Sequence, residues 1–99
     1  MRRRHTIDRD AISKLSQALD MLRANGFESL TEATIYFSVV EAELAGNYLD
    51  VSTGAKLTET PVSTFSRIAW SLHERGFIRY ERDAADRRRR VMRANLDAA

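Results

Sequence analysis

The spacing of apolar residues changes at Gly76, and this change limits the folds open to the chain. Before Gly76, apolar residues recur every three or four positions, the repeat that lines one face of an α-helix. After it, residues 77–82 and 89–96 alternate between two kinds of side chain, which is typical of half-buried strands. Residues 83–87 lie between the alternating runs as a loop. We therefore expect helices followed by a β-hairpin.

Four helices are expected before the hairpin. The first should run from about residue 8 to 23, the second from residue 29 or 31 to 44, and the third from about 52 to 58, preceded by a possible short edge strand over 48–51. The fourth should begin at Pro61, with Thr60 as its N-cap, and stop at Gly76. This order predicts a mainly α (α+β) fold, a winged helix-turn-helix with about four helices and a β-hairpin wing.

The composition narrows the classes of function. The 99 residues fit a single domain, 1–99, and include no cysteine and only two distant histidines. The sequence also lacks a glycine-rich phosphate loop, so we expect no metal, no cofactor and no enzymatic activity. No apolar run approaches the length of a membrane span, which predicts a cytoplasmic protein that does not contact membranes.

The charges are segregated along the chain. Residues 28–50 carry a formal charge of −5 without any Lys or Arg, whereas residues 79–99 carry +3. This pattern favours a polyanion-binding surface in the C-terminal half, with the acidic segment facing away from it. Residues 1–7 contain Arg2, Arg3 and Arg4 and are interpreted as a flexible basic arm, equally compatible with a frayed terminus and with DNA contact.

The predicted fourth helix, residues 61–76, carries residues suited to reading DNA. Ser63, Thr64, Ser66 and Arg67 lie in its first turns, opposite or beside the apolar stripe. Small hydroxyl side chains allow a helix to enter the major groove, and an arginine can make a bidentate contact to guanine or bind a phosphate. The helix dipole at Thr60 also favours a nearby phosphate. We expect these five residues to contact DNA.

The predicted wing, residues 77–96, contains four consecutive arginines, Arg87, Arg88, Arg89 and Arg90. Strand alternation would send Arg88 and Arg90 to one side and Arg87 and Arg89 to the other. Repelling charges grouped so tightly favour a polyanion partner over a merely solvated run. The wing is therefore expected to reach the minor groove or its phosphates.

Residues 62–67, 72–78 and 82–88 together resemble the recognition helix and wing of MarR-type transcriptional regulators. The resemblance covers about residues 52–96 and includes the Asp-x-Arg of the wing at Asp86 and Arg88. It implies that Asp86 orients Arg88 for insertion into the minor groove. One departure is Gly54-Ala55, which replaces the usual leucine-alanine pair. The third helix is therefore expected to be shorter or to shift onto Leu57.

The resemblance implies a sequence-specific regulator of transcription, with a repressor as the expected role. MarR-type proteins continue beyond the wing into dimerisation helices, whereas this sequence stops at Ala99. We therefore expect a homodimer formed through the first helix, with any small-molecule effector unknown. The apolar stripe of that helix also fits a role in the core, and both readings stay open. The stripe consists of Ile12, Leu15, Leu19 and Leu22.

Two other functions fit the same fold. A plasmid or phage replication or partition factor would use the winged helix on double-stranded DNA. A protein-interaction module would use the acidic second helix on a protein partner. Fold alone does not separate these functions, because function depends on the site.

Overall fold

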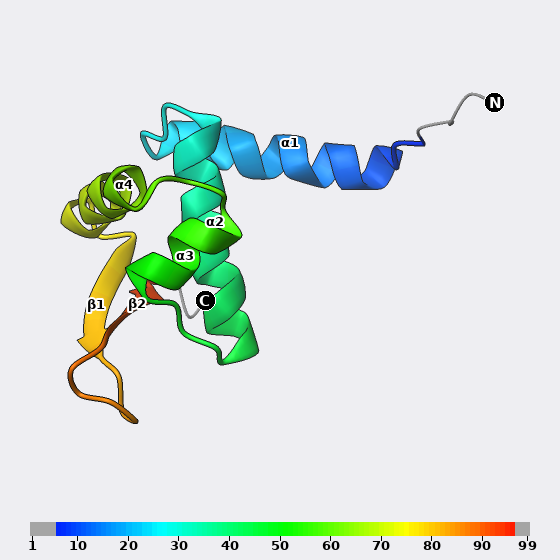
Figure 1. Ribbon diagram of the computed structural model, residues 1–99. Coiled ribbons are helices and arrows are strands. Elements are labelled where there is room, and N and C mark those ends of the chain that lie inside the picture. Colours follow the sequence, from blue (N-terminus) through cyan, green and yellow to red (C-terminus); the bar gives the residue numbers. More distant parts are fainter. Residues whose placement is uncertain (1–5, 97–99) are drawn as a thin grey trace.

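The computed structural model describes residues 6–96, so residues 2–4 of the predicted basic arm lie outside the described residues. Four helices precede a two-stranded antiparallel sheet (Figure 1). This order confirms the predicted mainly α winged-helix fold. None of the helices in the described part is both long and apolar enough to cross a membrane. The elements are α1 (Arg9–Ala24), α2 (Leu30–Ala45), α3 (Val51–Leu57), α4 (Val62–Glu74), β1 (Ile78–Arg82) and β2 (Arg90–Ala94).

Capping groups set the bounds of the first two helices. The Asp8 side chain accepts a hydrogen bond from the Asp10 backbone at the start of α1. At the start of α2, the Ser29 hydroxyl accepts the Glu32 N–H, and the Glu32 carboxylate accepts the N–H of Glu28. These bonds satisfy backbone donors that a helix start leaves free. Ser29 is therefore the N-cap of α2.

The prediction that Thr60 caps α4 is wrong. Glu59, at φ +52°, adopts the left-handed conformation, and the Thr60 N–H bonds to the Ala55 carbonyl. These contacts form the Schellman motif that ends α3, so Thr60 belongs to the C-terminal cap of that helix. The Thr60 hydroxyl donates to the Thr58 carbonyl at 3.1 Å. Pro61 is therefore the N-cap of α4 and makes no side-chain capping bond.

The core lies between α2, α4 and the hairpin. Phe65, Ala69 and Leu72 of α4 are fully buried, as their helical spacing predicts. Gly54 lets α3 approach α4 closely, because a Cβ there would lie 2.9 Å from Phe65 Cε2. Gly54 and Ala55 are buried, whereas Leu57 is exposed, so the expected shift of α3 onto Leu57 is wrong. The largest fully buried side chains are Phe65, Ile35, Leu72, Ile78, Met92 and Val39.

Helix α1 projects away from the rest of the fold (Figure 1). Leu22 is buried in the core and Leu19 packs against it. Ile12 and Leu15, nearer the N-terminal end, remain 46% and 48% exposed. The apolar stripe of α1 is therefore divided between a core-packing end and a projecting end.

The strands of the hairpin pair from Ile78 opposite Ala94 to Arg82 opposite Arg90. The possible edge strand at residues 48–51 is reduced to one bridge, in which the Leu49 carbonyl accepts the Met92 N–H at 2.8 Å. The hairpin loop is residues 83–89, slightly longer than predicted.

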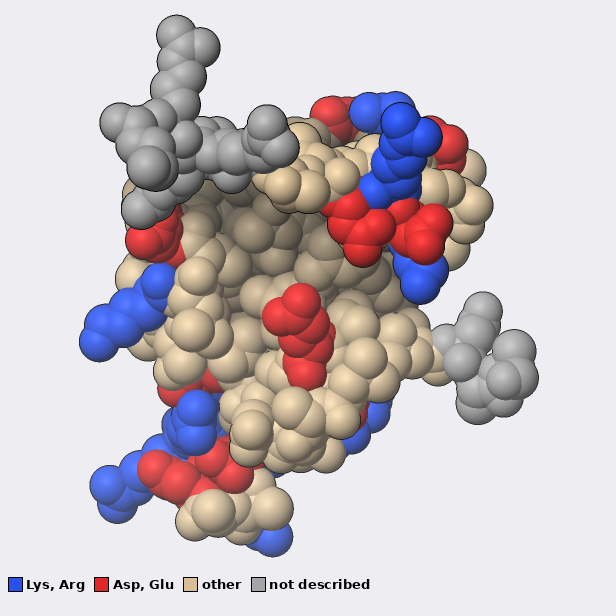
Figure 2. Space-filling view, turned by 90° about the vertical axis from the view of Figure 1, so that its right-hand side faces the viewer, with Lys and Arg blue, Asp and Glu red and all other residues tan. Residues whose placement is uncertain are grey.

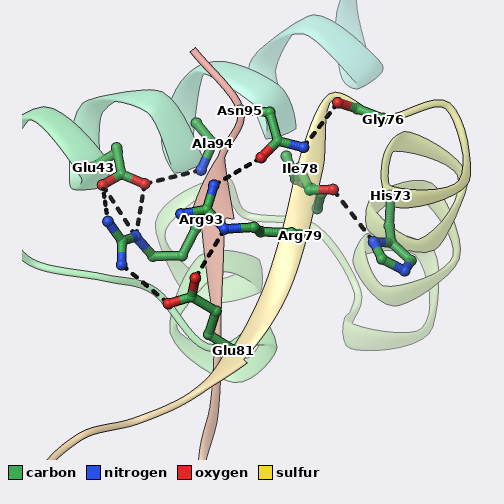
Figure 3. Close-up of polar contacts among 9 residues, drawn as sticks. All are labelled: Glu43, His73, Gly76, Ile78, Arg79, Glu81, Arg93, Ala94 and Asn95. Carbon is green, nitrogen blue, oxygen red and sulfur yellow. Dashed lines mark hydrogen bonds and ion pairs between the residues drawn. The ribbon is translucent and has the colours of Figure 1, made fainter. Parts of the chain in front are cut away.

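Acidic residues of α2 do not all face away from the basic C-terminal segment, so that part of the charge hypothesis is wrong. Arg93 of β2 donates to both carboxylate oxygens of Glu43, with Nη2 to Oε2 at 2.7 Å, and also to Glu81 (Figure 3). The Arg93 guanidinium also lies 3.9 Å from the Tyr48 ring centroid. The hydrogen bonds from Arg93 lower the pKa of Glu43. The wing is thereby tied to α2.

Asn95 joins the base of the wing to the end of α4. Its backbone N–H donates to the Phe77 carbonyl, and its side-chain Nδ2 donates to the Gly76 carbonyl, each at 2.9 Å. Its Oδ1 accepts a bond from Arg79 at 2.7 Å (Figure 3). Asn95 thus bonds to the turn after α4 at the Gly76 and Phe77 carbonyls and to β1 through Arg79.

Candidate nucleic-acid interface

The exposed face of α4 is the first part of the candidate site. Burial of Phe65 and Ala69 fixes the rotation of the helix about its axis. Ser63, Ser66 and Arg67 consequently point away from the core and are exposed, as predicted from the sequence. Positions 63, 66, 67 and 70 share one helical face, so Trp70 extends this surface by one turn.

The wing lies beside that face and completes a hollow with it. Arg90 of β2 lines the same hollow as Ser63, Ser66 and Arg67. The structure therefore brings together four of the residues predicted for the site. Val51 at the start of α3, Trp70 of α4 and Tyr80 of β1 supply its apolar lining.

Thr60 and Thr64 stand apart from the exposed face. Both are half-buried, and the Thr60 hydroxyl is already bonded to a backbone carbonyl. Their predicted DNA contacts stay predictions.

The wing tip carries three further predicted residues in a hydrogen-bonded turn. The Asp86 side chain accepts the backbone N–H of Arg88 at 3.0 Å, and the Asp86 carbonyl accepts the N–H of Arg89 at 3.0 Å. Arg87 and Arg88 are exposed in this turn rather than in a strand. The predicted strand alternation over residues 87–90 is therefore wrong, because a pleat does not set the sides on which Arg87 and Arg88 lie. Asp86 acts on the backbone of Arg88.

Arg89 is held by two carboxylates. Its Nε donates to Asp50 Oδ2 at 2.7 Å and its Nη1 donates to Asp83 Oδ2 at 3.2 Å. Asp50 also caps α3 by accepting the Thr53 N–H at 2.7 Å. The bond from Thr53, together with Arg89, holds the pKa of Asp50 below its ordinary value. We call Asp50, Asp83 and Arg89 the wing clamp, since they join the loop to the start of α3.

The other arginines of the site differ from Arg89 in having no carboxylate partner among the described residues. Within residues 6–96, Arg67, Arg87, Arg88 and Arg90 form no ion pair with a carboxylate. Arg67 of α4 and Arg90 of β2 line the hollow, and Arg87 and Arg88 lie in the loop at the wing tip. Such a surface is suited to a polyanion. The same described residues contain no group of three or more His, Cys, Asp or Glu side chains able to hold a metal ion.

Solved structures with the same arrangement are DNA-binding or regulatory proteins by their descriptions. Over 89% of this chain and 69% of the other, the fold matches Staphylococcus aureus MepR in a complex with DNA, with a TM-score of 0.65 and 19% sequence identity. PcaV from Streptomyces coelicolor, a transcriptional regulator solved with its natural ligand, matches with a TM-score of 0.59 and 21% identity. That match covers 93% of this chain and 68% of PcaV.

MarR itself matches over 92% of this chain and 65% of its own length, with a TM-score of 0.54 and 21% identity. The chain has a MarR-type winged-helix fold. The structural matches therefore confirm the fold that the sequence motifs indicated. No family model matches the sequence, and no curated protein matches it. At these identities the likeness concerns the fold, so the MarR-type fold locates α4 and the wing without assigning their partner.

Two features of the site were missed by sequence reasoning. Trp70 is not among the predicted site residues, although its helical spacing from Ser63 and Ser66 indicates the same exposed face. The wing clamp left no such signal, because Asp50 and Arg89 are 39 positions apart and belong to different elements.

Proposed function

We propose that the protein is a sequence-specific regulator of transcription that binds double-stranded DNA and acts as a repressor. In this proposal α4 is the recognition helix in the major groove, and the hairpin wing lies at the minor groove. The observation that carries the proposal is the hollow between them, where Ser63, Ser66, Arg67 and Arg90 meet. Hydroxyl groups with flanking guanidinium groups are suited to base edges and phosphates.

The charge distribution supports the same partner. Arg67, Arg87, Arg88 and Arg90 have no carboxylate partner within residues 6–96, so phosphates would not have to displace an existing ion pair. Arg89, in contrast, already bonds to Asp50 and Asp83. We therefore assign Arg89 to positioning the wing and the other arginines to contacting DNA.

Binding to a pool of random duplexes, followed by sequencing of those retained, tests the proposal and supplies a binding site. The affinity for that site should fall steeply with salt concentration, because each phosphate contact releases counterions. Absence of duplex binding at low salt would contradict the proposal and favour a protein partner.

Two variants distinguish a residue that contacts bases from one that contacts phosphates. Arg67→Ala should flatten the sequence preference, because Arg67 lies on the groove-facing side of α4. Arg88→Ala should weaken binding to all sequences and lower the salt slope by about 1 for a lost phosphate contact. Arg23→Ala is the matched control, since it removes the same charge from an exposed site on α1. Unchanged binding in both variants would show that these residues are wrongly assigned.

We also propose that the protein forms a homodimer through α1. Ile12 and Leu15 are about half exposed on the projecting end of that helix, on the same face as the core residue Leu22. On the face of the molecule toward which α1 projects, most charged side chains lie near the edges, and an acidic side chain stands near the middle, beside a hollow lined by uncharged residues (Figure 2). A second copy would cover this surface, and pairing would place two recognition helices on successive half-sites.

A further inference from the structure

The indole of Trp70, the single tryptophan of the chain, occupies an unusual place in the candidate interface. It is 52% exposed, although tryptophan carries one of the largest apolar surfaces of any residue. It lies on the face of α4 that also bears Ser66 and Arg67, and it lines the hollow that Arg90 closes from the wing. An apolar group is thus presented to solvent in a hollow that is also lined by Arg67 and Arg90, which form no ion pair within residues 6–96.

Neighbouring rings hold the indole in place. The Tyr80 ring of β1 is stacked with Trp70 at 6.1 Å between centroids, with an interplanar angle of 28°. The His73 ring lies 5.0 Å away, and its Nδ1 is 3.3 Å from the Ile78 carbonyl (Figure 3). Because the indole is packed on one side, ordering it on binding costs less conformational entropy than ordering a free side chain.

The surroundings limit what can cover the exposed side of this ring. Arg67 and Arg90 line the same hollow, so an apolar protein surface that filled it would leave two charges desolvated without partners. DNA offers phosphates for both guanidinium groups. In the major groove it also offers one apolar group, the 5-methyl group of thymine, which sits at the base edge.

We propose that Trp70 is a specificity-determining residue that packs against a thymine methyl group in the major groove. This inference rests on the proposed function and names one feature of the sequence that α4 would read. The indole supplies the apolar surface, and Tyr80 and His73 hold it in place. Arg67 and Arg90 bind the neighbouring phosphates or bases of the DNA.

Replacing thymidine by deoxyuridine removes only the methyl group and therefore isolates this contact. In a duplex selected by the parent protein, each thymidine is replaced in turn and the dissociation constant is measured. We expect one position in each half-site at which the replacement weakens binding by about fourfold. This factor corresponds to the free energy of burying one methylene-sized group. In Trp70→Ala the same replacement should have no effect, whereas Trp70→Phe should keep part of it.

Leu44→Ala serves as the control for loss of exposed apolar surface, because Leu44 is 75% exposed at the end of α2, outside the hollow. This variant should respond to deoxyuridine as the parent does. Trp70 fluorescence in the parent supplies a measurement that does not depend on any variant folding. Its emission should change on binding the thymidine duplex, and change less on binding the deoxyuridine duplex.

The outcomes separate the two proposals. A parent protein that binds no duplex overturns the proposed function and this inference with it. A parent that binds its selected duplex, but responds to no deoxyuridine replacement or responds as Trp70→Ala does, overturns the inference alone. Tighter binding to the single strand than to the duplex would also overturn it, since it would assign the indole to stacking on unpaired bases.

Discussion

Gly54 is a residue at which α3 packs tightly against α4. A Cβ there would lie 2.9 Å and 3.0 Å from Phe65 Cε2 and Cε1, and closer still to Cζ. Phe65 is fully buried, so its ring has no solvent to move into. Overpacking typically costs about 1–3 kcal/mol, against a gain of about 1 kcal/mol when alanine replaces glycine in a helix. We expect Gly54→Ala to lower the free energy of unfolding by up to about 2 kcal/mol, measured by urea denaturation.

The control for that variant is the same substitution in a Phe65→Leu background. The smaller side chain leaves room for the new methyl group, so there the alanine should be neutral or stabilising. An equal loss of stability in both backgrounds would show that the contact with Phe65 is not the cause.

Glu43 makes stability depend on pH through its bonds to Arg93. Because its pKa is lowered in the folded state, its contribution is complete above the unfolded value of about 4.5 and is lost as pH falls through the folded value. The parent should therefore lose stability below about pH 5, and Glu43→Gln should show a shallower loss over the same range. At neutral pH the variant should be less stable by about 1–3 kcal/mol, since it leaves Arg93 with a neutral partner.

Thermal unfolding measured at a series of pH values tests this expectation. Glu41→Gln is the control, because Glu41 lies on the same helix, is exposed and shows no such bond. Parallel pH profiles for the parent and Glu43→Gln would contradict the role given to Glu43.

At the scale of elements, the wing clamp sets the position of the hairpin loop relative to α3. Asp50→Asn should retain a helix cap while weakening the ion pair, because asparagine is a good N-cap residue. If Arg89 acts through Asp50, then Asp50→Asn and Arg89→Gln should each weaken DNA binding, and the double variant should be less affected than their sum predicts. A departure from additivity of about 0.5–1.5 kcal/mol is expected.

The control combines Asp50→Asn with Arg90→Gln. The effects of these two substitutions on DNA affinity should add, because Arg90 lines the hollow and does not bond to Asp50. Affinities of the parent, the three single variants and the two double variants are measured by titration at a series of salt concentrations. Additive effects for Arg89→Gln, with a salt slope lowered by about 1, would instead make Arg89 a direct phosphate contact.

The same scale explains what the sequence predicted well. The four helices and the hairpin were expected at nearly their observed bounds, because periodicity, the Ser29 cap and the left-handed Gly46 act within single elements. The cap of α4 was missed because Glu59 occupies the left-handed position that glycine usually fills, which hides the Schellman motif. Contacts such as Glu43 to Arg93, 50 positions apart, connect elements and carry no local pattern.

At the scale of the whole molecule, the proposed dimer depends on the projecting end of α1. We expect the parent to be a dimer in light scattering at micromolar concentrations. The double variant Ile12→Glu and Leu15→Glu should be a folded monomer, because both side chains are already about half exposed in a single copy. Leu19 is less suitable for this test, since it packs against the core.

Leu57→Glu is the control for added charge on an exposed apolar residue, as Leu57 is 67% exposed on α3. It should remain dimeric. Circular dichroism establishes that each variant is folded. A parent that is monomeric at these concentrations would contradict dimerisation through α1.

If the protein binds DNA as proposed, the bonds of Asn95 affect how it would recognise a duplex. They hold the turn between α4 and β1, so the helix and the wing present their side chains at a nearly constant separation. If the protein changes shape little on binding, the DNA has to bend or change its groove width to fit, and the ease of both changes depends on sequence. Flexible pyrimidine–purine steps should therefore be favoured between the points of contact, even where no side chain touches a base. The protein would then discriminate between duplexes by how easily they deform as well as by the bases that its side chains contact.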